Sequence, residues 1–117
     1  MLKGGNMKKG WQALGRLKTG VMNKSEAAYA QLLASNQNVA WFKFEGFKLR
    51  LADNTFYTPD FAVMLQSGNL ECHEVKGFWR DDARAKIKIA ADLYPFRFIA
   101  VTANAKKRGG GWKVEEF

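Results

Sequence analysis

A pair of predicted strands joined by a three-residue loop constrains the fold of this chain more than any other feature. The segments Thr55 to Leu65 and Asn69 to Lys76 are rich in apolar residues, and Gln66-Ser67-Gly68 separates them. A three-residue hairpin loop commonly closes with Gly in the left-handed conformation at its third position, where Gly68 falls. Pro59 cannot donate a ladder hydrogen bond, so we expect the first strand to be irregular there.

This hairpin fixes which residues of the two strands face each other. If Leu65 pairs with Asn69, counting back along both strands places Asp60 opposite Glu74. Directly opposed residues share a face, with Cβ atoms about 4.5 to 5.5 Å apart. Strand alternation adds Lys76 to the same face. The sequence therefore predicts two carboxylates and an amine on one surface.

Two neighbouring carboxylates in a low dielectric cannot both stay ionised cheaply, and a hard divalent cation between them resolves the conflict. A carboxylate-bound Mg²⁺ acts as a Lewis acid and lowers the pKa of its bound water, and Lys76 can assist the attack on a phosphodiester. Asp60, Glu74 and Lys76 therefore predict a metal-dependent phosphodiesterase site. The alternative is a structural Glu74–Lys76 pair on an exposed sheet face, with Asp60 in a turn after proline.

A third acid lies upstream, in a predicted helix. Asn23 or Ser25 can cap a helix to about Ala34, with Glu26 in the first turn, where the helix dipole favours an anion. Either Glu26 belongs to the inward face or it performs ordinary capping chemistry. The spacing predicts an inward stripe of four residues: Glu26, Tyr29, Ala30 and Leu33.

The remaining segments complete a mixed α/β pattern. Val39 to Leu51 is typical of a strand, bent or broken near Gly46. Asp81 or Asp82 can cap a helix to about Leu93, followed by an apolar strand, Phe96 to Thr102, like the second half of a β-α-β crossover. Trp112 to Glu116 is a last short strand. The predicted order is α-β-β-β-α-β with an extra strand, as a central mixed sheet flanked by helices.

Length and charge indicate the domain organisation and the partner. The 117 residues suit one folded domain, residues 23–117, preceded by a flexible arm, residues 1–22. The arm carries five basic residues and no acidic one, in a chain of net charge +8. Such a balance favours an anionic partner, nucleic acid above all, because neutralising phosphates releases counterions. Positive charge that merely maintains solubility is the alternative.

The apolar runs, the single cysteine, the single histidine and two aromatic residues indicate the class of protein further. No apolar run reaches the roughly 18 residues of a membrane helix, and a single cysteine, Cys72, excludes an internal disulfide, so we expect a soluble cytoplasmic protein. Cys72 is expected to be a small buried hydrophobe. His73, the only histidine, falls on the face opposite Glu74, which predicts a structural or solvent-facing role. Phe78 and Trp79 can stack on an unpaired base, but core packing is the favoured interpretation.

The ordered motifs resemble the PD-(D/E)XK nuclease superfamily. The resemblance rests on Thr58-Pro59-Asp60 and Glu74-Val75-Lys76 on successive strands, with Glu26 on a preceding helix and a helix and strand following. It covers roughly Asn23 to Thr102. In size and basic character the chain resembles small phage-encoded members related to Holliday-junction resolvases and to the phage endonuclease I type.

The resemblance implies a restriction-endonuclease-like αβββαβ core and an Mg²⁺-dependent DNA endonuclease, with Mn²⁺ as a substitute metal. It implies Asp60 and Glu74 as metal ligands, the Val75 backbone carbonyl as a further ligand, Glu26 as an acid bearing on the metal, and Lys76 as an assistant to the attacking water. The implied substrate is duplex or branched DNA in phage DNA metabolism, and a homodimer would suit symmetric incision.

Basic residues on both sides of the motif are the predicted phosphate contacts. They are Lys8, Lys9, Arg16, Lys18, Arg80, Arg84, Lys88, Lys106, Lys107 and Arg108. Arg80, Arg84 and Lys88 are expected on the outward face of the second helix. The competing hypothesis is a non-catalytic DNA- or RNA-binding accessory protein that uses the same basic surface.

Overall fold

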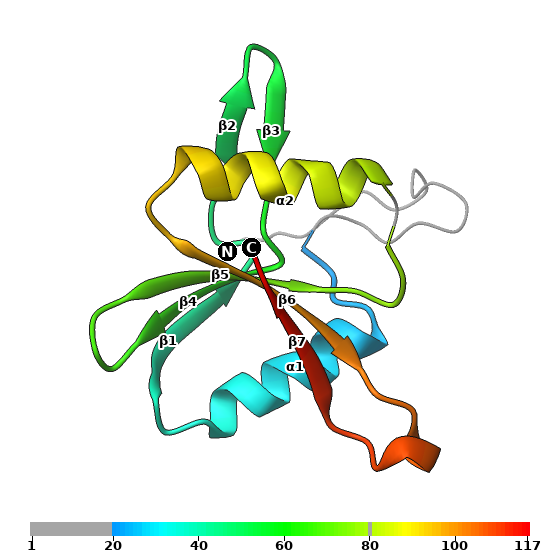
Figure 1. The fold of residues 1–117 in the computed structure, drawn as a ribbon. Helices are drawn as coiled ribbons and strands as arrows, with labels where there is room; N and C mark the ends of the chain where they lie inside the picture. Colours follow the sequence, from blue (N-terminus) through cyan, green and yellow to red (C-terminus); the bar gives the residue numbers. More distant parts are fainter. Residues whose placement is uncertain (1–19, 80) are drawn as a thin grey trace, which may run out of the picture.

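The computed structural model describes residues 20–79 and 81–117 of the chain, as two helices and a mixed sheet (Figure 1). The elements in chain order are α1 (Lys24–Ser35), β1 (Val39–Phe44), β2 (Leu49–Ala52), β3 (Thr55–Tyr57), β4 (Phe61–Leu65), β5 (Leu70–Val75), α2 (Asp81–Leu93), β6 (Arg97–Ala103), the 3-10 turn η1 (Lys106–Arg108) and β7 (Trp112–Glu116). Five strands form one sheet in the order β1-β4-β5-β6-β7, and β2 and β3 form a second, two-stranded sheet. The predicted mixed α/β class is confirmed.

Local signals set the start of α1. Asn23 is the N-cap, and its side chain accepts a hydrogen bond from the Glu26 backbone N–H at 2.8 Å. The Glu26 side chain in turn accepts from the Asn23 backbone N–H at 2.9 Å, which completes a capping box. Tyr29 and Leu33 are the buried residues of the helix, as the apolar spacing predicted.

The predicted hairpin register is confirmed. Antiparallel β4 and β5 pair Phe61 with His73 and Met64 with Leu70, and the Leu65 N–H donates to the Asn69 carbonyl at 2.9 Å. Gly68 has φ of 93°, the left-handed conformation that its place in the loop requires. Continuing the same register one step past β4 brings Asp60 level with Glu74.

Two predicted strands are each divided in the structure. The segment predicted as one strand over Val39 to Leu51 is β1 and β2, which belong to different sheets, and Thr55 to Leu65 is β3 and β4. The first break falls at Glu45, with φ of 49°, and at Gly46, where an added Cβ would lie 3.1 Å from the Ala62 Cβ. The second break contains Pro59. The β2–β3 hairpin stands above the main sheet beside α2 (Figure 1).

The β-α-β crossover is also confirmed. Strands β5 and β6 are parallel and joined through α2, while β7 returns antiparallel to β6. Helices α1 and α2 cover opposite faces of the sheet (Figure 1). Each face has its own buried cluster, with Tyr29 and Phe61 on the α1 side and Cys72 and Ile87 on the α2 side. In the described part of the chain, no helix is both long and apolar enough to cross a membrane.

Candidate functional site

Backbone hydrogen bonds hold Asp60 and Glu74 against each other where β4 begins and β5 ends. The Asp60 backbone N–H donates to Glu74 Oε1 at 3.3 Å, and the Val75 N–H donates to Asp60 Oδ2 at 2.8 Å. The Asp60 carbonyl accepts from the Glu45 N–H at 2.7 Å, which ties the turn after β1 to the same point. The structure thus brings together the two acids that the hairpin register predicted.

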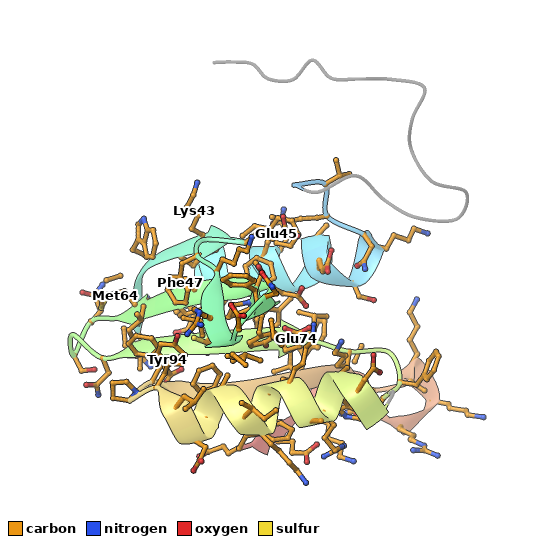
Figure 2. The ribbon with its side chains drawn as sticks, turned by 90° about the horizontal axis from the view of Figure 1, so that it is seen from above. Lys43, Glu45, Phe47, Met64, Glu74 and Tyr94 are labelled. Carbon is orange, nitrogen blue, oxygen red and sulfur yellow. The ribbon has the colours of Figure 1, made fainter. Side chains whose placement is uncertain are left out.

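Glu74 is the more enclosed of the two acids and has further partners. Its side chain lies between the sheet and α2 (Figure 2), and the residue is only 8% exposed. The Tyr57 hydroxyl donates to Glu74 Oε1 at 2.7 Å, and Lys76 Nζ lies 3.2 Å from Oε2. Tyr57 was not predicted, because strand β3 reaches Glu74 only through the separate β2–β3 sheet.

The electrostatics of the site are those of two neighbouring acids that are largely removed from water. Burial, and next the charge of Glu74, raise the pKa of Asp60 to about 8. Burial and the charge of Glu74 also raise the pKa of the Tyr57 hydroxyl, which therefore remains a hydrogen-bond donor. Without a cation, the pair retains a proton at neutral pH.

Glu26 belongs to the same site. A cavity of about 650 Å³ is lined by residues from both helix N-termini and from the end of β5, namely Asn23, Glu26, Asp60, Glu74, Val75, Lys76, Gly77, Phe78 and Ala83. Glu26 caps α1 and its charge also contributes to the raised pKa of Asp60. The two interpretations of Glu26, capping and membership of the site, therefore hold together.

The residues present fit a hard divalent cation. Carboxylate and carbonyl oxygens are the ligands that Mg²⁺ accepts, and it usually retains several waters. Asp60, Glu74 and Val75 line the cavity with oxygen-bearing groups. Among residues 20–79 and 81–117, no three acidic, histidine or cysteine side chains are grouped closely enough to form a metal site alone. A cation here would therefore depend on two carboxylates, backbone and water.

His73 is structural and buried, so its predicted solvent-facing alternative is wrong. The Tyr29 hydroxyl lies 2.6 Å from Nδ1, and Nε2 lies 2.8 Å from Glu71 Oε1. Burial lowers the pKa of His73. A neutral ring that donates from Nε2 to the carboxylate and accepts from the hydroxyl satisfies both bonds. Arg97, from the neighbouring strand, completes this cluster at 2.9 Å from Glu71.

The predicted phosphate contacts divide into three groups. Lys8, Lys9, Arg16, Lys18 and Arg80 lie outside the described residues. Lys88, Lys106, Lys107 and Arg108 are exposed. Arg84 differs from its predicted outward placement: its guanidinium donates to both carboxylate oxygens of Glu115 and stacks 4.4 Å from the Trp79 ring centroid. The charge of Arg84 is therefore already paired within the fold.

The structure agrees with the predicted packing of Cys72 and Trp79 but differs from that of Phe78. Cys72 is buried, and burial raises the pKa of its thiol to about 12, so the expected small hydrophobe is confirmed. Trp79 packs against Phe117, with ring centroids 5.8 Å apart. Phe78 does not enter the core, contrary to the favoured interpretation: it is 76% exposed and lies at the edge of the site cavity.

Comparison with protein-family models, with curated proteins and with solved structures finds no match.

Proposed function

We propose that this chain is a metal-dependent endonuclease that hydrolyses DNA phosphodiester bonds. The observation that carries the proposal is the partly buried contact between Asp60 and Glu74, with Lys76 Nζ 3.2 Å from Glu74 Oε2. Two neighbouring acids that line a cavity beside an amine are arranged for a cation and an anionic substrate.

The metal-binding residues in this proposal are Asp60 and Glu74, with the Val75 carbonyl as a further ligand and Glu26 as an additional acid of the cavity. Bound Mg²⁺ would supply a Lewis acid for the phosphate and a water of lowered pKa. The Val75 N–H and the Tyr57 hydroxyl hold the two carboxylates in place. Fixed carboxylates avoid reorganisation during the reaction.

Lys76 is the proposed assistant to the attacking water. Its ammonium group is held between the Glu74 carboxylate and the Trp79 ring, 5.6 Å from the ring centroid. The side chain is 22% exposed, so it contacts Glu74 and also lines the cavity. From this position the ammonium group can orient the water or steady the negative charge that develops on the phosphate.

DNA is the proposed substrate because of charge and because of Phe78. The chain carries a net charge of +8, and exposed Lys106, Lys107 and Arg108 form one turn on the β6–β7 connection. An exposed aromatic ring at the edge of the cavity can stack on an unpaired base. This combination favours branched or frayed DNA over a fully paired duplex.

A cleavage panel tests the proposal. Duplex, nicked, flap and four-way-junction DNA are incubated with the protein and Mg²⁺, alongside Asp60→Asn, Glu74→Gln and Lys76→Met. We expect cleavage by the wild type and its loss in all three variants, with DNA binding retained. Asp53→Asn is the matched control, because Asp53 lies on the β2–β3 turn with a side chain 91% exposed. Cleavage retained in all three site variants would contradict the proposal.

The second candidate is a non-catalytic DNA- or RNA-binding protein with the same fold. It is favoured by the bonding of Glu74, which the Tyr57 hydroxyl, the Asp60 N–H and Lys76 already satisfy without a metal. A titration with Mn²⁺ separates the two candidates. Binding that Asp60→Asn abolishes supports the nuclease, and no binding by the wild type supports the accessory protein.

A further inference from the structure

Strand β7 forms an open edge of the main sheet. It pairs with β6 on one side, in a continuous register from Trp112 to Glu116, and with no strand of the described residues 20–79 and 81–117 on the other. The opposite edge of the sheet, β1, differs because its register shifts between Val39 and Trp41. A bulge in an edge strand hinders its pairing with a further strand, so β7 is the edge better suited to accept one.

The direction of the backbone groups along β7 follows from the hydrogen bonds at its two ends. The Asn104 N–H donates to the Gly111 carbonyl, and the Phe117 N–H donates to the Phe98 carbonyl. Because bonding direction alternates along a strand, the odd-numbered residues of β7 face β6. The N–H and C=O groups of Trp112, Val114 and Glu116 therefore point away from the sheet and are available to a further strand.

We infer that β7 pairs antiparallel with β7 of a second copy of this chain, centred on Val114. This centre places Lys113 opposite Glu115 of the partner subunit and, by symmetry, Glu115 opposite Lys113 of the partner subunit. Opposed residues of opposite charge stabilise an antiparallel pair. The same register joins Trp112, Val114 and Glu116 through their outward backbone groups, so each available donor and acceptor finds a partner.

The charges select this register over its neighbours. Outward-bonding residues must face outward-bonding residues, so the two nearest alternative registers have the two-fold centre at Lys113 or at Glu115. Either centre places two like charges directly opposite each other, which is destabilising. Charges of one sign would protect the edge from any self-pairing. The opposite signs of Lys113 and Glu115, one on each side of Val114, make it self-complementary.

Two further observations fit a second copy on this edge. Val114 is 57% exposed, an apolar side chain in the middle of an open strand, and its own counterpart would cover it. Glu115 is bound by Arg84, which fixes the carboxylate in position before pairing. Arg84, Glu115 and Lys113 of the partner subunit would then form a row of alternating charge. Pairing through β7 does not depend on the proposed nuclease chemistry.

Sedimentation velocity of the whole chain over a concentration series tests this interface. We expect a monomer–dimer equilibrium in the wild type. Val114→Pro removes an outward N–H without touching the β6 ladder, so it should give a monomer. Lys113→Glu turns two attractive pairs into two repulsive ones and should weaken the dimer about tenfold or more. Lys107→Glu changes the same charge outside β7 and should leave the dimer unchanged.

A mixing experiment tests the register itself. Lys113→Glu and Glu115→Lys each place like charges across the two-fold axis when alone, but a mixture restores two opposite pairs. We expect a heterodimer on mixing, with circular dichroism establishing that each variant is folded. A wild type that stays monomeric at every concentration would overturn the proposal. A dimer unaffected by both Val114→Pro and Lys113→Glu would do the same, because it would use another surface.

Discussion

The Val75 backbone N–H donates a hydrogen bond to Asp60 Oδ2 at 2.8 Å, so the residue between Glu74 and Lys76 holds the acid that directly precedes β4. The two motifs are therefore joined by direct hydrogen bonds at the point where β4 begins and β5 ends. This relationship makes the individual contributions of the site residues separable by substitution.

Asp60→Asn should change activity and stability in opposite directions. The amide keeps the size of the side chain but removes a charge from the buried pair, so the metal-free protein should unfold at a higher urea concentration at pH 8. Cleavage should fall by more than about a hundredfold, because even outer partners of metal sites contribute up to that factor. Urea denaturation and single-turnover cleavage measure the two effects. Lower stability together with lost activity would indicate a merely structural role.

Tyr57→Phe should weaken metal binding without abolishing it. The substitution removes the hydroxyl that donates to Glu74 Oε1 at 2.7 Å and leaves the ring in place. We expect metal affinity to fall by about tenfold, as for other outer partners of metal ligands. Isothermal titration with Mn²⁺ measures the change. Tyr94→Phe is the control, because the Tyr94 hydroxyl bonds the Arg50 carbonyl away from the cavity. Equal loss in both variants would contradict the assignment.

The stability of the metal-free protein should decrease as the pH rises. The pKa of Asp60 is raised in the folded protein from its ordinary value of 3.8 to about 8, so the folded state binds this proton more tightly than the unfolded state. The stabilising contribution is complete below about pH 4 and is lost as the pH rises towards 8. Urea denaturation across this range measures the slope. Saturating Mg²⁺ or the Asp60→Asn substitution should flatten it, and an unchanged slope in the variant would refute the assignment to Asp60.

The Glu71–His73 pair should matter for stability and not for chemistry. Both side chains are at most 9% exposed, and they lie on the α1 side of β5, away from Glu74. Glu71→Ala would leave His73 Nε2 without its buried hydrogen-bond acceptor and Arg97 without one of its two partners, and should cost about 1 to 3 kcal/mol of unfolding free energy. Glu116→Gln, at an exposed partner of Arg97, should cost much less, because water screens the pair. Denaturation of both variants, with cleavage measured in parallel at low temperature, checks the contrast.

Sequence reasoning succeeded where short-range chemistry decides the structure. Gly68 fixes the hairpin loop and through it the register that aligns Asp60 with Glu74, and Asn23 with Glu26 fixes the start of α1. These features depend on residues at most a few positions apart or on one turn between two strands. They include the two acids and the amine of the candidate site.

The features that were missed depend on contacts between distant segments. Tyr57 reaches Glu74 because β2 and β3 leave the main sheet and pack beside α2, which strand alternation cannot indicate. Arg84 bonds to Glu115, 31 residues away in the sequence, and Tyr29 bonds to His73, 44 residues away. An outward helical Arg and an alternating His carry no sequence signal of such partners. The predicted β-α-β crossover did not include the register of β5 against β6, which places Arg97 beside Glu71.

The most direct test of the central claim is cleavage of end-labelled four-way-junction DNA by the purified protein, with Mg²⁺ titrated from zero, against Glu74→Gln purified identically. The proposed site predicts products that appear only with the divalent cation and only with the wild-type protein. No product at any Mg²⁺ or Mn²⁺ concentration, or the same product from Glu74→Gln, would contradict a nuclease centred on Asp60 and Glu74.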